Sequence, residues 1–148
     1  MRAFHYSFQK VLDLKTNEKK QAEWVLSQAV GQLQAEEQSL SCLLTELDTA
    51  HRGLQQCADE CSPAFQLQQW QQYIFHLEMK KDSARQRVQS AERQVRSKQD
   101  DLAARMCDEK VWTKAREKAE EQFKKQMALV EQNEMDEIAT VRYFTAAR

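Results

Sequence analysis

The chain has 148 residues, of which 30% are charged, and its formal net charge is −1 at pH 7. With only 2 Gly and 1 Pro, its composition is typical of long helices and not of a turn-rich fold. Acidic and basic residues are interspersed, so the chain lacks the concentrated basic face that nucleic-acid binding needs. No apolar run approaches the ~20 residues that span a bilayer. These features argue against nucleic acid as the main ligand and predict no membrane insertion.

The N-terminus and the cysteines indicate a compartment. The first residues contain no apolar signal segment, and 4 Cys in such a chain predict reduced thiols in a cytoplasm. Cys57 and Cys61 are spaced by three residues, and only His51 and His76 could complete a metal site with them. The simpler interpretation is that both cysteines act as small apolar residues of a helix interface. We therefore predict no metal and no cofactor.

The first expected helix covers residues from about 5 to about 60. Its leucines recur every seventh residue, and small residues such as Ala22, Ala29 and Ala50 occupy the second apolar position of the same repeat. A seven-residue apolar repeat is typical of a coiled coil. Gly31 and Gly53 weaken this helix by roughly 1 kcal/mol each relative to Ala, without ending it. The leucines of the repeat are Leu12, Leu26, Leu33, Leu40, Leu47 and Leu54.

A turn is expected near residues 61–63, followed by a second helix over about 63–146. Ser62 can cap this helix, with Pro63 at its first position, where the missing N–H costs nothing. A second seven-residue repeat follows. Because the connection is short, the two helices should pack antiparallel. The apolar residues of this repeat are Leu67, Trp70, Ile74, Leu77, Ala84, Val88, Ala91, Val95 and Leu102.

The repeats also predict which residues face each other. Leu33 falls opposite Ala91 and Leu40 opposite Ala84, so large residues meet small ones in most layers, although Leu47 falls opposite Leu77. In the same register Lys15 faces Glu109, as an ion pair. Lys19 falls opposite Arg105, a pairing that does not fit and that requires both side chains to bend outward. The predicted fold is all-α: a single antiparallel coiled-coil hairpin of residues 1–148.

This register leaves the second helix without a partner beyond about residue 120. The unpaired part, here called the overhang, would be ~40 Å of single helix at 1.5 Å per residue. Met135, Ile138 and Val141 follow helical spacing along it. A lone helix with an apolar stripe either frays or binds another protein.

Three large aromatic residues lie off the predicted interface. Trp24 points away from the second helix, and Tyr73 and Phe75 lie outside the apolar repeat. Such residues are candidate partner contacts, although Tyr73 can equally cover the edge of the interface. The sequence contains no phosphate-binding glycine loop and no catalytic motif, so we predict that the protein is not an enzyme.

Three stretches together resemble one family, the bacterial flagellar export protein FliJ. The first comprises Tyr6–Lys15 and Asn17–Lys19, the second Trp70–Ile74 with Leu77–Glu78, and the third Glu134–Ala139. The resemblance covers the whole chain in length and helix plan. It implies a non-catalytic part of the flagellar type III export apparatus, similar in fold to the central stalk subunit of rotary ATPases.

The resemblance also implies partners, a location and candidate contact residues. The partners are the hexameric export ATPase FliI, the membrane export gate protein FlhA and export chaperones, at the cytoplasmic face of the membrane beneath the flagellum. The predicted gate-binding residues are Tyr73, Phe75 and Leu77. The predicted ATPase-binding residues are Phe8, Leu14, Met135, Asp136, Glu137, Ile138 and Arg142.

The sequence leaves two other hypotheses of function open. A self-associating structural coiled coil would bury the overhang and the off-interface aromatics against a second copy. A hairpin arm of a nucleic-acid-binding machine would show a basic face, which this sequence lacks.

Overall fold

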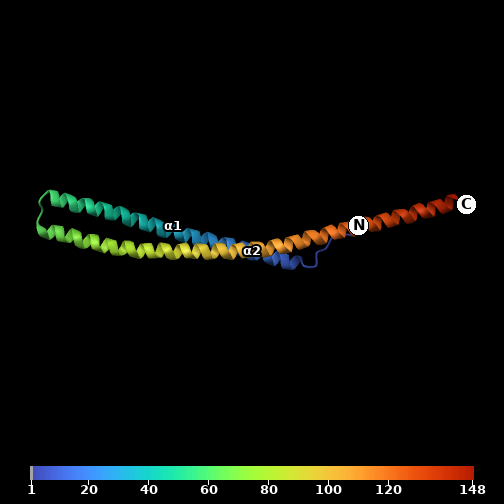
Figure 1. The fold of residues 1–148 in the computed structure, drawn as a ribbon, viewed down its shortest axis with the longest axis horizontal. Coiled ribbons are helices and arrows are strands. Elements are labelled where there is room, and N and C mark those ends of the chain that lie inside the picture. Colours follow the sequence, from blue (N-terminus) through green and yellow to red (C-terminus); the bar gives the residue numbers. More distant parts are fainter. Residues whose placement is uncertain (1) are drawn as a thin grey trace. The chain divides into compact units, whose positions relative to one another are not determined.

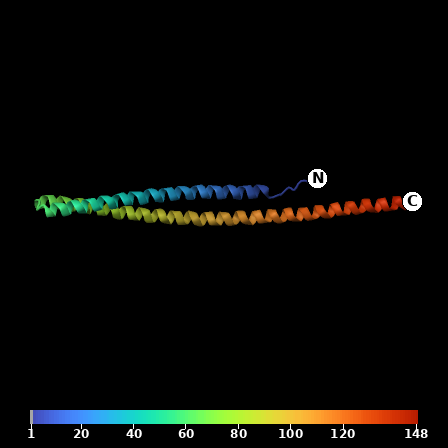
Figure 2. The ribbon, with the colours of Figure 1, turned by 90° about the horizontal axis from the view of Figure 1, so that it is seen from above.

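The computed structural model describes residues 2–148. It consists of two α-helices, α1 (Gln9–Asp59) and α2 (Ala64–Ala146), and the described residues contain no β-strand. The helices are joined by a short turn and run antiparallel, and the C-terminal part of α2 continues with no other element beside it (Figures 1 and 2). The predicted all-α helical hairpin is therefore confirmed.

The first helix begins later than predicted, at Gln9 instead of near residue 5. The N–H of Gln9 donates to the Tyr6 carbonyl at 3.1 Å, and residues 2–6 before this turn are not helical. Phe4, Tyr6 and Phe8 alternate along the sequence, and in an extended chain alternate side chains share one face. Tyr6 is only 8% exposed, and its ring centroid lies 6.5 Å from that of Phe4 and 5.9 Å from that of Phe8. Packing of these aromatic rings therefore replaces the first helical turn.

The turn between the helices is closed by a left-handed residue. Cys61 has a φ of 52°. Its N–H donates to the Ala58 carbonyl at 3.2 Å, and the Ser62 N–H donates to the Cys57 carbonyl at 3.1 Å. This pair of bonds is the Schellman motif, which ends a helix most often at glycine. The Pro63 carbonyl accepts bonds from Gln66 and Leu67, so α2 starts at Ala64, one residue later than predicted.

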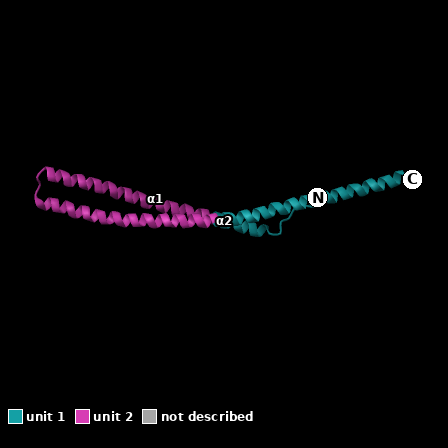
Figure 3. Ribbon diagram, viewed as in Figure 1, with its two compact units in different colours: residues 1–20, 104–148 teal, residues 21–103 magenta. Residues whose placement is uncertain are grey.

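The chain divides into two compact units (Figure 3). Unit 2 comprises Gln21–Ala103 and contains the turn. Its core is built around Leu47, Ala50, Ile74 and Leu77, and Leu77 is 2% exposed. Farther along α2 in the same unit, the buried residues at the helix interface include two alanines: Ala84 is 0% and Ala91 is 7% exposed. The buried positions of unit 2 therefore include both large aliphatic residues and alanines.

Gly53 allows one of these core contacts. A Cβ atom at Gly53 would lie 2.6 Å from Cη2 of Trp70, so the indole ring rests directly on the backbone of α1. At Gly31 an added Cβ would meet nothing within 4 Å. The two glycines thus differ in role, although both lie inside α1.

Unit 1 comprises Met1–Lys20 and Ala104–Arg148. Aromatic rings join its N-terminal segment to α2: the centroids of Phe4 and Phe123 lie 5.5 Å apart, and those of Phe8 and Trp112 lie 5.9 Å apart. The guanidinium of Arg116 sits 6.0 Å from the Phe4 ring centroid. These contacts hold the N-terminal segment against α2.

The ion pairs of unit 1 correct one sequence prediction. Glu109 pairs with Lys19, at 2.9 Å, and not with Lys15, whose ammonium lies 3.5 Å from Glu18 and 3.9 Å from Asp108. Arg105, predicted to oppose Lys19 unfavourably, reaches Glu18 at 3.0 Å. Long side chains reach along the neighbouring helix to the nearest carboxylate, so facing positions alone do not determine ionic partners.

The overhang is shorter than predicted. Because Phe4 reaches Phe123, α2 is still covered there, and Met127 remains half-buried. From residue 128 to the C-terminus every residue is exposed. In the structure the overhang therefore comprises residues 128–148, and its helical part, which ends at Ala146, is ~28 Å long at 1.5 Å per residue.

Candidate partner-binding surfaces

The overhang, residues 128–148, carries the largest group of exposed apolar side chains in unit 1. Met135 is 70%, Ile138 52% and Val141 62% exposed. Acidic residues Asp136 and Glu137 lie among them, within the same helix. The exposed large apolar residues of the overhang are Leu129, Val130, Met135, Ile138, Val141, Tyr143 and Phe144.

The other two predicted ATPase contacts, Phe8 and Leu14, lie elsewhere in unit 1. Phe8 packs against Trp112 and is 53% exposed, and Leu14 is 55% exposed on α1. Met135 lies ~35 Å along α2 from Trp112, at 1.5 Å per residue. The structure therefore does not bring Phe8 and Leu14 together with the five predicted contacts in the overhang.

In unit 2, Tyr73 lies at the edge of the helix interface. It is 46% exposed, and its ring centroid lies 6.2 Å from that of Trp70. Thr45 and Thr49 of α1 line a shallow hollow together with these two aromatic rings. Tyr73 thus has a supported position and an accessible face, which a partner contact needs.

Phe75 and Leu77, grouped with Tyr73 by the sequence, do not share this surface. Leu77 is buried in the core at 2% exposure, so a partner cannot touch it without opening the interface. Phe75 is 63% exposed, but two residues along a helix correspond to a rotation of about 200°. Phe75 therefore faces the opposite side of α2 from Tyr73.

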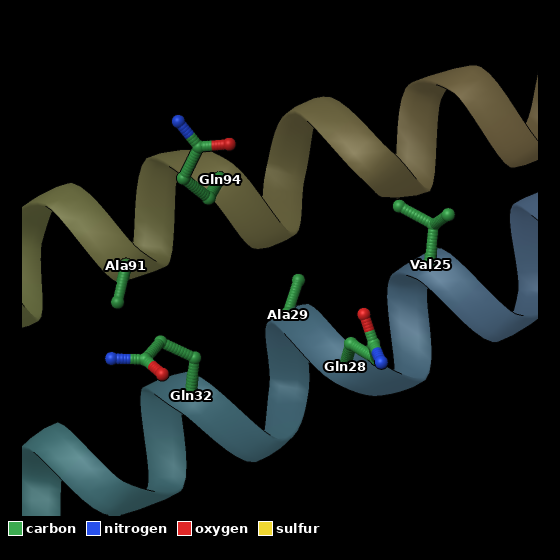
Figure 4. Close-up of a pocket in the computed structure, with 6 residues that line it drawn as sticks. All are labelled: Val25, Gln28, Ala29, Gln32, Ala91 and Gln94. Atoms are coloured by element: carbon green, nitrogen blue, oxygen red, sulfur yellow. The ribbon is translucent and has the colours of Figure 1, made fainter.

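A second hollow of unit 2 lies over the alanine layer of the interface (Figure 4). Ala29 of α1 and Ala91 of α2 each point toward the other helix, and Val25 adjoins them. The rims are glutamines, namely Gln28, Gln32 and Gln94. This lining of methyl and amide groups holds no carboxylate, thiol or imidazole, so it offers a packing surface and no chemistry.

Within residues 2–148, no three or more His, Cys, Asp or Glu side chains are grouped so that they could hold a metal ion. All four cysteines are free thiols. In the same range no helix is both long and apolar enough to cross a membrane.

A model of the flagellar FliJ protein family matches residues 4–148 of this sequence. The chain belongs to the FliJ family. The fold of this FliJ-family chain is similar to the solved structure of a putative YscO homolog from Chlamydia trachomatis, with a TM-score of 0.69 and 19% identity. That match covers 95% of this chain and 96% of the other, so the likeness of fold extends over nearly the whole hairpin. No curated protein matched the sequence.

Sequence reasoning missed two features of this FliJ-family hairpin. One is the contact of the Trp70 ring with the backbone at Gly53. The predicted register placed these two residues nearly opposite each other, which was the available signal. The other is the extended N-terminal segment, for which the alternation of Phe4, Tyr6 and Phe8 was the available signal.

Proposed function

We propose that this chain is a non-catalytic component of the flagellar type III protein export apparatus, with separate contact surfaces in its two units. The overhang of unit 1 binds the hexameric export ATPase FliI, and the Tyr73 surface of unit 2 binds the export gate protein FlhA. Membership of the FliJ family and the motifs at Tyr6–Lys15, Trp70–Ile74 and Glu134–Ala139 support this role. Under this proposal the protein acts in the cytoplasm, at the inner face of the membrane beneath the flagellum. Export chaperones are further candidate partners there.

The observation that carries the ATPase proposal is the complete exposure of the overhang. The C-terminal end of α2 carries seven exposed large apolar side chains, and no other part of the described residues 2–148 covers them. Isolated helices of this length are marginal in water, so binding should order the overhang as well as bury it. Burying apolar surface contributes roughly 25 cal/mol per Å², which makes this stripe the main source of affinity.

Charged residues of the overhang are suited to orient the complex. Asp136, Glu137 and Arg142 are all exposed and lie within two helical turns of each other. Charges at the rim of an interface mainly set association rate and orientation. Neutralising Asp136 and Glu137 should therefore slow association with the ATPase more than it speeds dissociation.

Deletion of residues 133–148 tests the ATPase proposal. None of the ring contacts and ion pairs between α1 and α2 involves these residues, so thermal unfolding of the hairpin should stay nearly unchanged. Stimulation of the FliI ATPase should be lost. A truncated chain that still stimulates the ATPase would contradict the proposal.

A pair of point variants sharpens this test. Ile138→Ala with Val141→Ala removes two exposed side chains of the overhang and should weaken ATPase binding at least about tenfold, or ~1.4 kcal/mol. Val111→Ala is the matched control, because Val111 is 65% exposed on the same helix but lies outside the overhang. Equal binding by both variants would place the contact elsewhere.

The gate proposal is tested at Tyr73. Tyr73→Ala removes an exposed ring without touching the core and should weaken binding to the cytoplasmic part of FlhA, while circular dichroism stays unchanged. Phe75→Ala is the control on the opposite side of the same helix, and it should leave FlhA affinity unchanged. If Phe75→Ala weakens FlhA binding and Tyr73→Ala does not, the contact surface has been assigned to the wrong side of α2.

A further inference from the structure

A second apolar stripe runs along α2 next to the turn, on the side away from α1. Its residues are spaced alternately by three and four positions, as in a coiled-coil repeat. The first four lie two positions before the interface residues Leu67, Trp70, Ile74 and Leu77, a rotation of about 200° around the helix. The stripe, here called the back stripe, consists of Phe65, Gln68, Gln72, Phe75 and Met79.

The back stripe is exposed, and all of it except Met79 lies in an uncharged segment of α2. Phe65 is 67%, Phe75 63% and Met79 59% exposed. Between Ala64 and Leu77 there is no Asp, Glu, Lys or Arg, although 30% of the whole chain is charged. Two exposed phenylalanines on an uncharged helical face, followed by the exposed Met79, are a candidate contact surface.

The pattern of the back stripe is complementary to itself. When two copies align antiparallel with Gln68 opposite Gln72, Phe65 of each copy meets Phe75 of the other. Both ends of the interface then hold a phenylalanine pair, and the centre holds two glutamine pairs whose amides can donate and accept. An interface between identical copies related by a two-fold axis requires this kind of match.

The nearest charges favour the same alignment. The nearest charges at the turn are acidic, Asp59 and Glu60, whereas the far end of the stripe carries a balanced set, Glu78, Lys80, Lys81 and Asp82. An antiparallel arrangement brings the acidic turn of one copy to this balanced end of the other. A parallel arrangement would place Glu60 beside Glu60, which is repulsive.

We propose that the back stripe is a self-association site, at which two copies of this chain pair antiparallel through α2. The inference is independent of the export role. The exposed parts of the two phenylalanines per copy amount to roughly 550 Å² for the pair, well below the ~1,200 Å² of a standard stable interface. The dimer is therefore weak and reversible, forming at high local concentration. Pairing covers Phe75 and leaves Tyr73 uncovered.

Sedimentation velocity of the full chain over a concentration series tests the proposal. The chain should be monomeric near ~10 μM and increasingly dimeric toward ~1 mM, as expected for an interface of this size. Phe65→Ala with Phe75→Ala should lower the association constant at least about tenfold. Trp24→Ala is the control, because Trp24 is 61% exposed on α1 and lies outside the stripe. A chain that stays monomeric throughout, or a dimer that the double variant does not weaken, overturns the proposal.

Disulfide cross-linking tests the orientation. In a background of Cys42→Ser, Cys57→Ala, Cys61→Gly and Cys107→Ser, chains with Gln68→Cys are mixed with chains with Gln72→Cys and oxidised. The antiparallel dimer predicts mainly mixed cross-links between positions 68 and 72. Predominant links between identical positions would show a parallel arrangement and overturn the proposal.

Discussion

Replacing each of the two glycines by alanine provides a sensitive test of the packing in unit 2. Both glycines lie inside α1, where alanine is favoured over glycine by about 1 kcal/mol. At Gly31 nothing lies within 4 Å of the added methyl group, so Gly31→Ala should stabilise unit 2 by about 1 kcal/mol.

At Gly53 the same methyl group meets the indole of Trp70. The added Cβ would lie 2.6, 2.9 and 3.0 Å from three ring carbons, so the ring must move away from a core that includes Leu47 and Leu77. Overpacking of this kind costs about 1–3 kcal/mol, which offsets the gain in helix propensity. We expect Gly53→Ala to be neutral or destabilising by up to about 2 kcal/mol.

The difference between the two variants isolates the contact, because the propensity gain is common to both. Gly53→Ala should unfold about 4–12 °C below Gly31→Ala in a thermal melt, for a difference of 1–3 kcal/mol at roughly 4 °C per kcal/mol. Urea titration gives the same difference as a free energy. Equal stabilisation by both substitutions would refute the placement of Trp70 on the α1 backbone.

Three further substitutions test other parts of the fold. Cys61→Gly should stabilise the hairpin by about 1 kcal/mol, because Cys61 has a φ of 52° and glycine adopts this conformation without strain. The control Cys61→Ala should give no gain in the free energy of unfolding, measured for both variants by urea unfolding. Leu77→Ala should destabilise unit 2 by about 2–5 kcal/mol in the same assay, whereas Tyr73→Ala should change stability by less than about 1 kcal/mol. Phe4→Ala removes the ring contact with Phe123, worth about 0.5–1.5 kcal/mol, and should speed hydrogen exchange of α2 amides near Phe123 only. Faster exchange throughout unit 2 would contradict that local role.

The helix plan followed from the sequence because a seven-residue repeat constrains it strongly. The apolar positions of the repeat in α1 had to face α2, and one register placed Leu47 near Leu77 and alanines opposite large residues. The overhang followed from the same register and the unequal helix lengths. These features depend on the spacing of apolar residues, which can be read completely from a single sequence.

Other features depend on local geometry that periodicity does not describe. The pairing of Lys19 with Glu109 reflects how far a flexible side chain reaches along the partner helix. The start of α1 at Gln9 reflects competition between a helical turn and burial of Tyr6. The separation of Tyr73 from Phe75 follows from helix rotation alone and was available from the sequence, but motif similarity grouped the two residues.

The proposed role of the overhang is tested most directly by hydrogen exchange of the chain with and without the FliI hexamer. In the free protein, amides of residues 128–148 should exchange fast, because no other element covers them. With FliI present, protection should appear in this segment and not around Tyr73. Unchanged exchange of residues 128–148 in a complex that has demonstrably formed would contradict the account.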